Sequence, residues 1–146
     1  MCRMIILSEA GRTFERLGRD MVENAIEKKV WAVVGATNNK DKFGCRIYKR
    51  LLKAGYEVYP VNPGIAEIDG AKCYATIADL PVIPDVVNIV VPSKIAVEIV
   101  KEAAEKGVKI VWLQPGSDKP EVVQAASEAG LEVIEDCVLT RIFAKK

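Results

Sequence analysis

Short apolar segments alternate with longer amphipathic segments along most of this 146-residue chain, and no other feature restricts its fold as strongly. Strands are predicted at residues 30–34, 56–61, 86–91, 109–113 and 131–135. Helices are predicted at residues 43–54, 93–106 and 120–129, with short helical pieces near 76–80 and after Cys137. Because parallel strands need crossover helices, the alternation predicts an α/β fold: a single doubly wound parallel sheet with helices on both faces. The expected strand order is 3-2-1-4-5, with ligands bound at the carboxyl ends of the strands.

The chain begins with a further amphipathic segment, from Ser8 to Lys29. We therefore predict an N-terminal helical extension over residues 1–29, packed on the domain or on a partner, and one domain over residues 30–146. The length suits a single domain with a sizeable core. Neither a membrane-spanning run nor a signal-peptide pattern is found in the sequence, so a cytoplasmic location is expected.

The composition excludes several kinds of chemistry. The chain has no histidine, which excludes a Ser-His-Asp or Cys-His catalytic set and a phosphohistidine intermediate. Its four cysteines form no C-x-x-C pair, so free thiols are expected and no metal site is predicted. No paired carboxylates have a convincing catalytic spacing, and the best candidates for chemistry are Asp136 and Cys137 after the last strand. The sequence therefore favours a binding protein over an enzyme, and no catalytic residue is assigned.

Charge is balanced overall at +1 but is concentrated in residues 40–53, where six basic side chains face Asp41 alone. A small basic region on a nearly neutral protein indicates a small anionic ligand rather than a nucleic acid. From the charges alone, a solvated basic helix face explains the same pattern equally well.

The first predicted strand ends in Gly35, Ala36 and Thr37 and leads into the basic helix. A buried strand, a tight turn and a helix N-terminus in this order form a phosphate site. The dinucleotide motif G-x-G-x-x-G would place its second and third glycines at Thr37 and Lys40, and no Walker A lysine follows. The turn is therefore suited to phosphate without matching an NAD motif or a P-loop.

The end of the second predicted strand points to a phosphorylated ribose. NAD-binding proteins usually have an acidic residue there, whereas this chain has Asn62 followed by Pro63. Lys42 and Arg46, one helical turn apart, would attract a ribose phosphate. NADP and coenzyme A (CoA) both carry such a phosphate.

Several spaced motifs carry a family resemblance. They are Val33-Val34-Gly35-Ala36-Thr37, Lys42-Phe43-Gly44, Tyr59-Pro60-Val61-Asn62-Pro63, Val90-Val91-Pro92, Val111-Trp112-Leu113-Gln114-Pro115-Gly116 and Glu135-Asp136-Cys137. Over about residues 28–140 the chain resembles the small stand-alone CoA-binding proteins. Their Rossmann-like domain is similar to the N-terminal CoA-binding domain of the succinyl-CoA synthetase alpha subunit.

This resemblance implies that the Gly35 turn and Lys42 approach the CoA phosphates, that Asn62 and Pro63 border the adenosine, and that two later loops line the ligand. The predicted cofactor-binding residues are Gly35, Ala36, Thr37, Asn38, Lys42, Phe43, Arg46, Asn62, Pro63, Val91, Pro92, Gln114, Pro115 and Gly116. Each has a plainer reading: Gly35 as a turn glycine, Lys42 as a solvated lysine and the prolines as strand ends.

Three functions follow as hypotheses. The first is non-catalytic binding of CoA or an acyl-CoA, with no nucleic acid or membrane partner and with a homodimer or another protein partner left open. The second is an NADP-dependent oxidoreductase, and the third is a redox protein whose thiol, at Cys45 near the helix start, forms a mixed disulfide with CoA.

Overall fold

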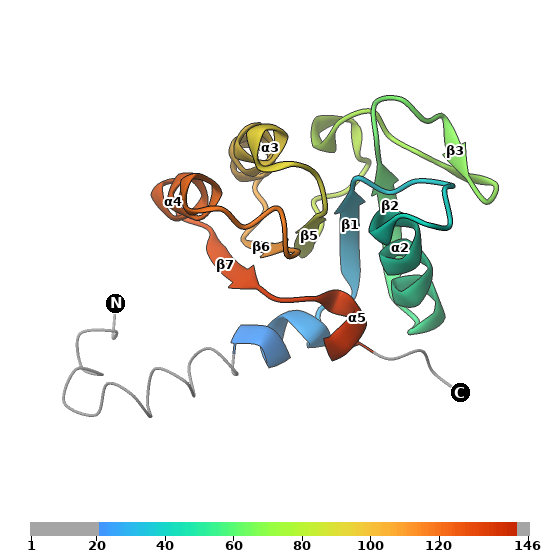
Figure 1. Ribbon diagram of the computed structural model, residues 1–146, viewed down its shortest axis with the longest axis horizontal. Coiled ribbons are helices and arrows are strands. Elements are labelled where there is room, and N and C mark those ends of the chain that lie inside the picture. Colours follow the sequence, from blue (N-terminus) through green and yellow to red (C-terminus); the bar gives the residue numbers. More distant parts are fainter. Residues whose placement is uncertain (1–20, 143–146) are drawn as a thin grey trace.

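A five-stranded parallel sheet forms the centre of the computed structural model, which describes residues 21–142 (Figure 1). Its order is β2-β1-β5-β6-β7, where β2 is Glu57–Val61, β1 is Val30–Val34, β5 is Val86–Ile89, β6 is Ile110–Leu113 and β7 is Glu132–Glu135. A small antiparallel hairpin, β3 (Glu67–Ile68) with β4 (Ala71–Lys72), projects from the link after β2. The predicted α/β class with a doubly wound parallel sheet is confirmed.

Helices cover both faces of the sheet because successive strand residues point to opposite sides. On one side, α2 (Phe43–Lys53), α5 (Val138–Arg141) and the helical residues 21–27 pack on a cluster that includes Trp31, Val33 and Trp112. On the other side, α3 (Ser93–Lys106), α4 (Pro120–Glu128) and the 3₁₀ turn η2 (Ile77–Asp79) cover the alternate residues of the same strands. The strands are therefore apolar on both faces, as a covered parallel sheet requires.

The expected strand order 3-2-1-4-5 is wrong for the five strands as predicted. The third of them, β5, lies in the middle of the sheet beside β1, not at the edge beside β2. The outer side of β2 is occupied instead by Tyr74, which forms a parallel bridge with Val61 and exchanges backbone hydrogen bonds with Pro60 and Asn62. A one-residue bridge takes the edge position, so the next full strand is placed on the far side of β1.

The helix boundaries follow the sequence closely, with one difference at α3. The helix begins at Ser93, as expected, but no side chain caps it. The Ser93 hydroxyl donates a hydrogen bond to the Gly116 carbonyl instead, at 3.3 Å, and so joins the loops after β5 and β6. At the other end Gly107 closes the helix in the left-handed conformation, with a φ of 100°.

The predicted N-terminal extension falls mostly outside the described residues, which include only its last part. Residues 21–27 are helical and pack on the sheet through Met21, Val22, Ala25 and Ile26. The Tyr56 hydroxyl donates a hydrogen bond to the Ile26 carbonyl. The division of the chain at residue 29 stays a prediction.

Two further findings concern residues 21–142. None of their helices has the length and apolar character needed to cross a membrane. Within the same range, no three Cys, Asp or Glu side chains come together in a way that could hold a metal ion.

Burial of Tyr48 predicts alkaline sensitivity. Only 1% of this residue is exposed, and burial, with smaller contributions from Asp69 and Cys73, raises the pKa of its phenol above the usual 10.0. Between the unfolded and the folded pKa the unfolded chain binds fewer protons, so the free energy of unfolding falls as pH rises. We expect urea unfolding to show a loss of stability above about pH 10 that is smaller in Tyr48→Phe than in the parent chain. An equal alkaline loss in both proteins would contradict this.

Candidate functional site

The turn after β1 lies at the carboxyl edge of the sheet between β2 and β5. Gly35 has a φ of 103° and donates its N–H to the Val61 carbonyl at 2.9 Å. A Cβ atom at this position would lie 2.4 Å from the Val90 carbonyl oxygen. Both the positive φ and the close approach of the next strand therefore require glycine here. Gly35 is therefore a turn glycine, in agreement with the structural alternative. It also places the backbone at the carboxyl ends of the strands, where ligands of such sheets bind.

The first turn of α2 packs directly on this turn. A Cβ at Gly44 would lie 2.0 Å from the Gly35 carbonyl oxygen and 3.3 Å from the Ala36 Cα. Gly44 belongs to the Lys42-Phe43-Gly44 motif, but it was not among the predicted binding residues. The signal for it was present in the sequence, since glycine disfavours helix and needs a packing reason when it stands in one.

Electrostatics at this helix start favour an anion. Lys42 precedes the first turn of α2, no side chain caps it, and the turn holds no acidic residue. The helix therefore presents N–H groups and the positive end of its dipole without the usual compensation. Lys42 and Arg46 are exposed, and the Arg46 guanidinium lies 5.5 Å from the centre of the exposed Phe43 ring.

Not all of the positive charge of residues 40–53 is available to a ligand. Lys49 is 3.8 Å from Asp69, and Arg50 donates to the carbonyls of Leu139 and Ile142. The basic charge that remains near the turn is carried by Lys40, Lys42 and Arg46.

Polar side chains hold the loops around the turn in place. Asn62, at the end of β2, donates its amide to the Ala36 carbonyl at 2.9 Å and accepts the Gly64 N–H at 3.0 Å. The Thr37 hydroxyl accepts the Asn39 N–H, and the Asn38 amide donates to the Glu67 carbonyl of the hairpin. Asn62, Thr37 and Asn38 thus have structural partners, while Pro63 is exposed beside them.

The loops after β5 and β6 are joined at the same edge. The Val91 side chain would contact a Cβ at Gly35 at 3.0 Å, so Val91 lies over the turn. The Ser117 hydroxyl accepts the Val91 N–H at 3.0 Å and donates to the Val91 carbonyl at 2.5 Å. Pro92, Pro115 and Gly116 are exposed next to this contact. Ser117 was missed by the sequence reasoning because nothing marks a loop serine that pairs with a residue 26 positions earlier.

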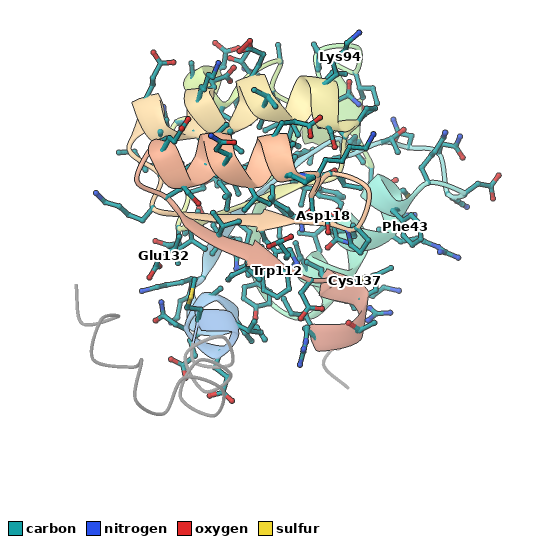
Figure 2. All side chains as sticks on the ribbon, turned by 60° about the vertical axis from the view of Figure 1, so that its left-hand side comes forward. Phe43, Lys94, Trp112, Asp118, Glu132 and Cys137 are labelled. Atoms are coloured by element: carbon teal, nitrogen blue, oxygen red, sulfur yellow. The ribbon has the colours of Figure 1, made fainter. Side chains whose placement is uncertain are left out.

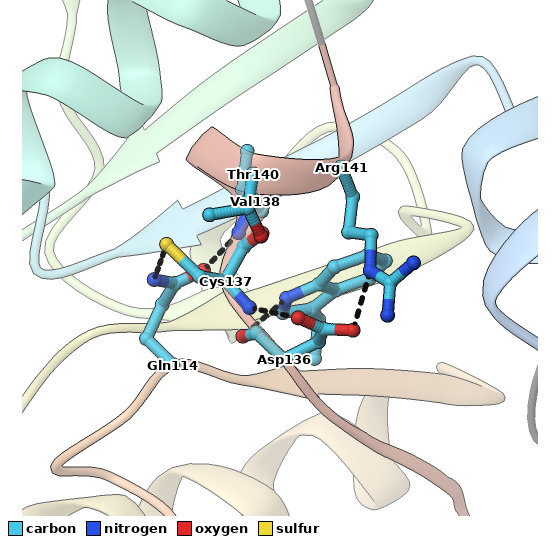
Figure 3. A network of polar contacts seen from close by, with 7 residues as sticks. Gln114, Asp136, Cys137, Val138, Thr140 and Arg141 are labelled. Carbon is cyan, nitrogen blue, oxygen red and sulfur yellow. Dashed lines mark hydrogen bonds and ion pairs between the residues drawn. The ribbon is translucent and has the colours of Figure 1, made fainter.

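Gln114 occupies a different environment from the other predicted residues. It is 2% exposed, and its side chain turns into the protein, where its Oε1 accepts the Val138 N–H at 2.8 Å and an Asn88 amide N–H at 3.2 Å. Its Nε2 lies 3.4 Å from the Cys137 Sγ (Figure 3). In this conformation its side chain joins the sheet to α5 and takes no part in the exposed rim.

A separate hollow of about 260 Å³ lies at the amino ends of the strands, opposite the Gly35 turn. Its lining residues include Ile83, Asp85, Lys109 and Glu132. None of the predicted binding residues lines it. Phe43, Asp118 and Cys137 lie toward the other end of the molecule from Glu132 (Figure 2). The two ends of the strands are therefore distinct surfaces, and the turn, the α2 start and the later loops share one of them.

Comparison with known proteins identifies the family. The sequence model of the CoA binding domain family matches residues 29–142, which include all five strands of the main sheet. The chain belongs to this family.

Its relatives in the CoA binding domain family include larger proteins. The alpha subunit of ADP-forming acetate–CoA ligase II from Pyrococcus furiosus is 34% identical over 119 residues, which are 73% of this chain and 26% of that subunit. The chain thus spans about a quarter of the ligase subunit's length. YneT of Bacillus subtilis is 32% identical over 72% of this chain and 78% of its own length. A solved structure from Pyrococcus horikoshii is 36% identical, with a TM-score of 0.79, and the match covers 85% of this chain and 88% of that one.

Proposed function

We propose that this chain binds CoA or an acyl-CoA without transforming it, with the diphosphate at the Gly35 turn and the start of α2. The contact between Gly44 and Gly35 carries this proposal. It seats an uncapped helix N-terminus directly on the partly buried Gly35 turn, and the exposed Lys42 and Arg46 lie beside it. Backbone N–H groups, a helix dipole and two cations at one place favour a phosphorylated ligand.

The other parts of the site have supporting roles in this proposal. Val91 lies over Gly35 and offers an apolar wall, and Asn62 fixes the carbonyl of Ala36 so that the turn keeps its shape without a ligand. A turn ordered in advance lowers the entropic cost of binding. Gln114 supports the edge from inside rather than contacting CoA.

A binding role without catalysis is supported by the residue types available. The chain has no histidine to accept a phosphoryl group or act as a base near neutral pH. The match covers 26% of the ligase alpha subunit, so that relative's whole reaction is not carried over to this chain.

Isothermal titration with CoA and with dephospho-CoA tests the ligand. We expect CoA to bind about tenfold or more tightly, because only CoA carries the ribose phosphate that Lys42 and Arg46 attract, and tenfold corresponds to about 1.4 kcal/mol. Lys42→Ala and Arg46→Ala should each reduce that preference. Lys53→Ala, at the far end of the same helix, is the matched control and should not change it.

Two results would contradict the proposal. One is an absence of CoA binding at millimolar concentration. The other is tight NADPH binding without CoA binding, which would favour a nucleotide-dependent oxidoreductase domain.

A further inference from the structure

Cys137 differs from the other cysteines among residues 21–142 in its access to solvent. Cys45 is 2% exposed and Cys73 is 6% exposed, whereas Cys137 is only partly buried. Burial also raises the pKa of the Cys73 thiol, which opposes formation of a thiolate. Cys45, which the redox hypothesis placed near the ligand, is thus a buried residue of α2.

The Cys137 sulfur faces a fixed hydrogen-bond donor. The Gln114 amide is oriented by the two N–H groups that its oxygen accepts, from Asn88 and Val138, so its Nε2–H is directed to Sγ at 3.4 Å (Figure 3). The hydrogen bond therefore fixes the orientation of the sulfur that would attack a disulfide.

A second observation points to a ligand group at this place. Asn88 is 0% exposed and its Oδ1 has no hydrogen-bond partner among residues 21–142, although its Nδ2 donates to Gln114. A buried acceptor without a donor is unfavourable, and native structures usually supply it with a partner. Asn88 lies in β5 in register with Trp112, so its unfilled acceptor belongs to the sheet face on which Gln114 reaches Val138 and Cys137. The pantetheine arm of CoA carries two amide N–H groups and a terminal thiol, which are donors of the kind this acceptor lacks.

Cys137 also lies on the same side of the sheet as the proposed phosphate site. It directly precedes α5, and α5 is joined to α2 by Arg50, which donates to the carbonyls of Leu139 and Ile142 at 3.0 and 2.9 Å. The start of α2 carries the phosphate site and its body contacts α5. A CoA molecule held by its phosphates at the first turn of α2 would extend its pantetheine arm from the carboxyl ends of the strands, where Cys137 also lies.

We propose that Cys137 exchanges with CoA disulfides and holds CoA as a mixed disulfide, which rests on the proposed CoA site. In this step the Cys137 thiolate attacks one sulfur of a CoA disulfide. The Cys137–CoA S–S bond forms, the S–S bond of the reagent breaks, and one CoA leaves as a thiolate that takes up the proton lost by Cys137. The disulfide reagent is itself the oxidant, and a second thiol reverses the reaction.

The test is intact-mass analysis of the reduced full chain after incubation with CoA disulfide. We expect one CoA adduct, located at Cys137 by peptide mapping and removed by dithiothreitol. The rate should exceed that with hydroxyethyl disulfide by about tenfold or more, because binding orients the reagent. Cys137→Ser should abolish this adduct, while Cys45→Ser should keep it.

The outcomes separate this proposal from the CoA-binding proposal. Titration of Cys137→Ser with CoA measures the site without the reactive thiol, and we expect an unchanged Kd. If CoA binds but no adduct forms, if the adduct maps to another cysteine, or if hydroxyethyl disulfide reacts equally fast, the exchange proposal is overturned and CoA binding stands. If CoA itself does not bind, the CoA-binding proposal fails first.

Discussion

Replacing Gly44 with alanine is expected to weaken CoA binding by about tenfold or more and to lower the free energy of unfolding by about 1–3 kcal/mol. A Cβ here would lie 2.0 Å from the Gly35 carbonyl oxygen, a contact that only a shift of α2 or of the turn can relieve. Helix propensity alone would make the same change stabilising by about 1 kcal/mol. The sign of the effect therefore distinguishes close packing from propensity, and thermal unfolding with titration calorimetry measures it.

The control for Gly44→Ala is Gly64→Ala. A Cβ at Gly64 would meet only the Asn62 Oδ1, at 3.6 Å, which is an ordinary contact. This variant should keep both the stability and the CoA affinity of the parent chain within a small margin. A more stable Gly44→Ala protein with unchanged CoA affinity would show that the helix does not need to touch the turn.

Replacing Trp112 with alanine is expected to cost about 3–5 kcal/mol of stability, a large part of the 5–15 kcal/mol that typical domains have. The side chain is 0% exposed, and its ring centre is 5.6 Å from that of Trp31 in the core under α2 and α5. Its indole N–H also donates to the Asp136 carbonyl at 2.8 Å. Chemical denaturation measures the loss, and Trp112→Phe should recover most of it because only the hydrogen bond and part of the ring are removed.

Trp31→Phe is a matched control for Trp112→Phe. Trp31 is equally buried, but its indole N–H donates to the carbonyl of Lys28, at 3.1 Å. Lys28 precedes the amino end of β1 and lies far from residues 136–138 in the sequence. Both variants should lose similar stability. Amide hydrogen exchange at residues 136–138 should accelerate only in Trp112→Phe, since only that change frees the backbone next to Cys137. Equal exchange in both variants would show that the indole does not hold this segment.

The sequence was sufficient to predict the main helices and strands, but not which segment lies beside β2 at the edge of the sheet. The spacing of apolar residues and the glycines at 55, 107 and 130 placed α2, α3, α4 and the five strands of the main sheet within about two residues of their observed ends. The small hairpin of β3 and β4 was not predicted. The strand order was predicted wrongly because Tyr74 forms a single bridge beside Val61. A bridge of one residue has no alternation of apolar and polar residues that could be recognised in the sequence.

Part of the proposed site could be predicted from the order of residues along the chain. Gly35, Lys42 and Arg46 follow from a strand, a turn and a basic helix start read in order. The inward orientation of the Gln114 side chain could not be predicted in this way. Whether a polar residue after a strand faces the carboxyl ends of the strands or the interior depends on partners such as Asn88 and Val138. Gly44 was visible as a glycine inside a helix, but its contact with Gly35 was not.

The α/β class and the strand–turn–helix order around Gly35 could be predicted from the amino-acid sequence alone. These properties are local or compositional, and neighbouring residues along the chain are enough to specify them. Only the folded structure shows that Gly44 seats α2 on the turn, that Gln114 turns inward and that Cys137 is partly exposed while Cys45 is buried. Each of these depends on side chains far apart in sequence, whose contacts arise only when the strands are paired and the helices pack on them.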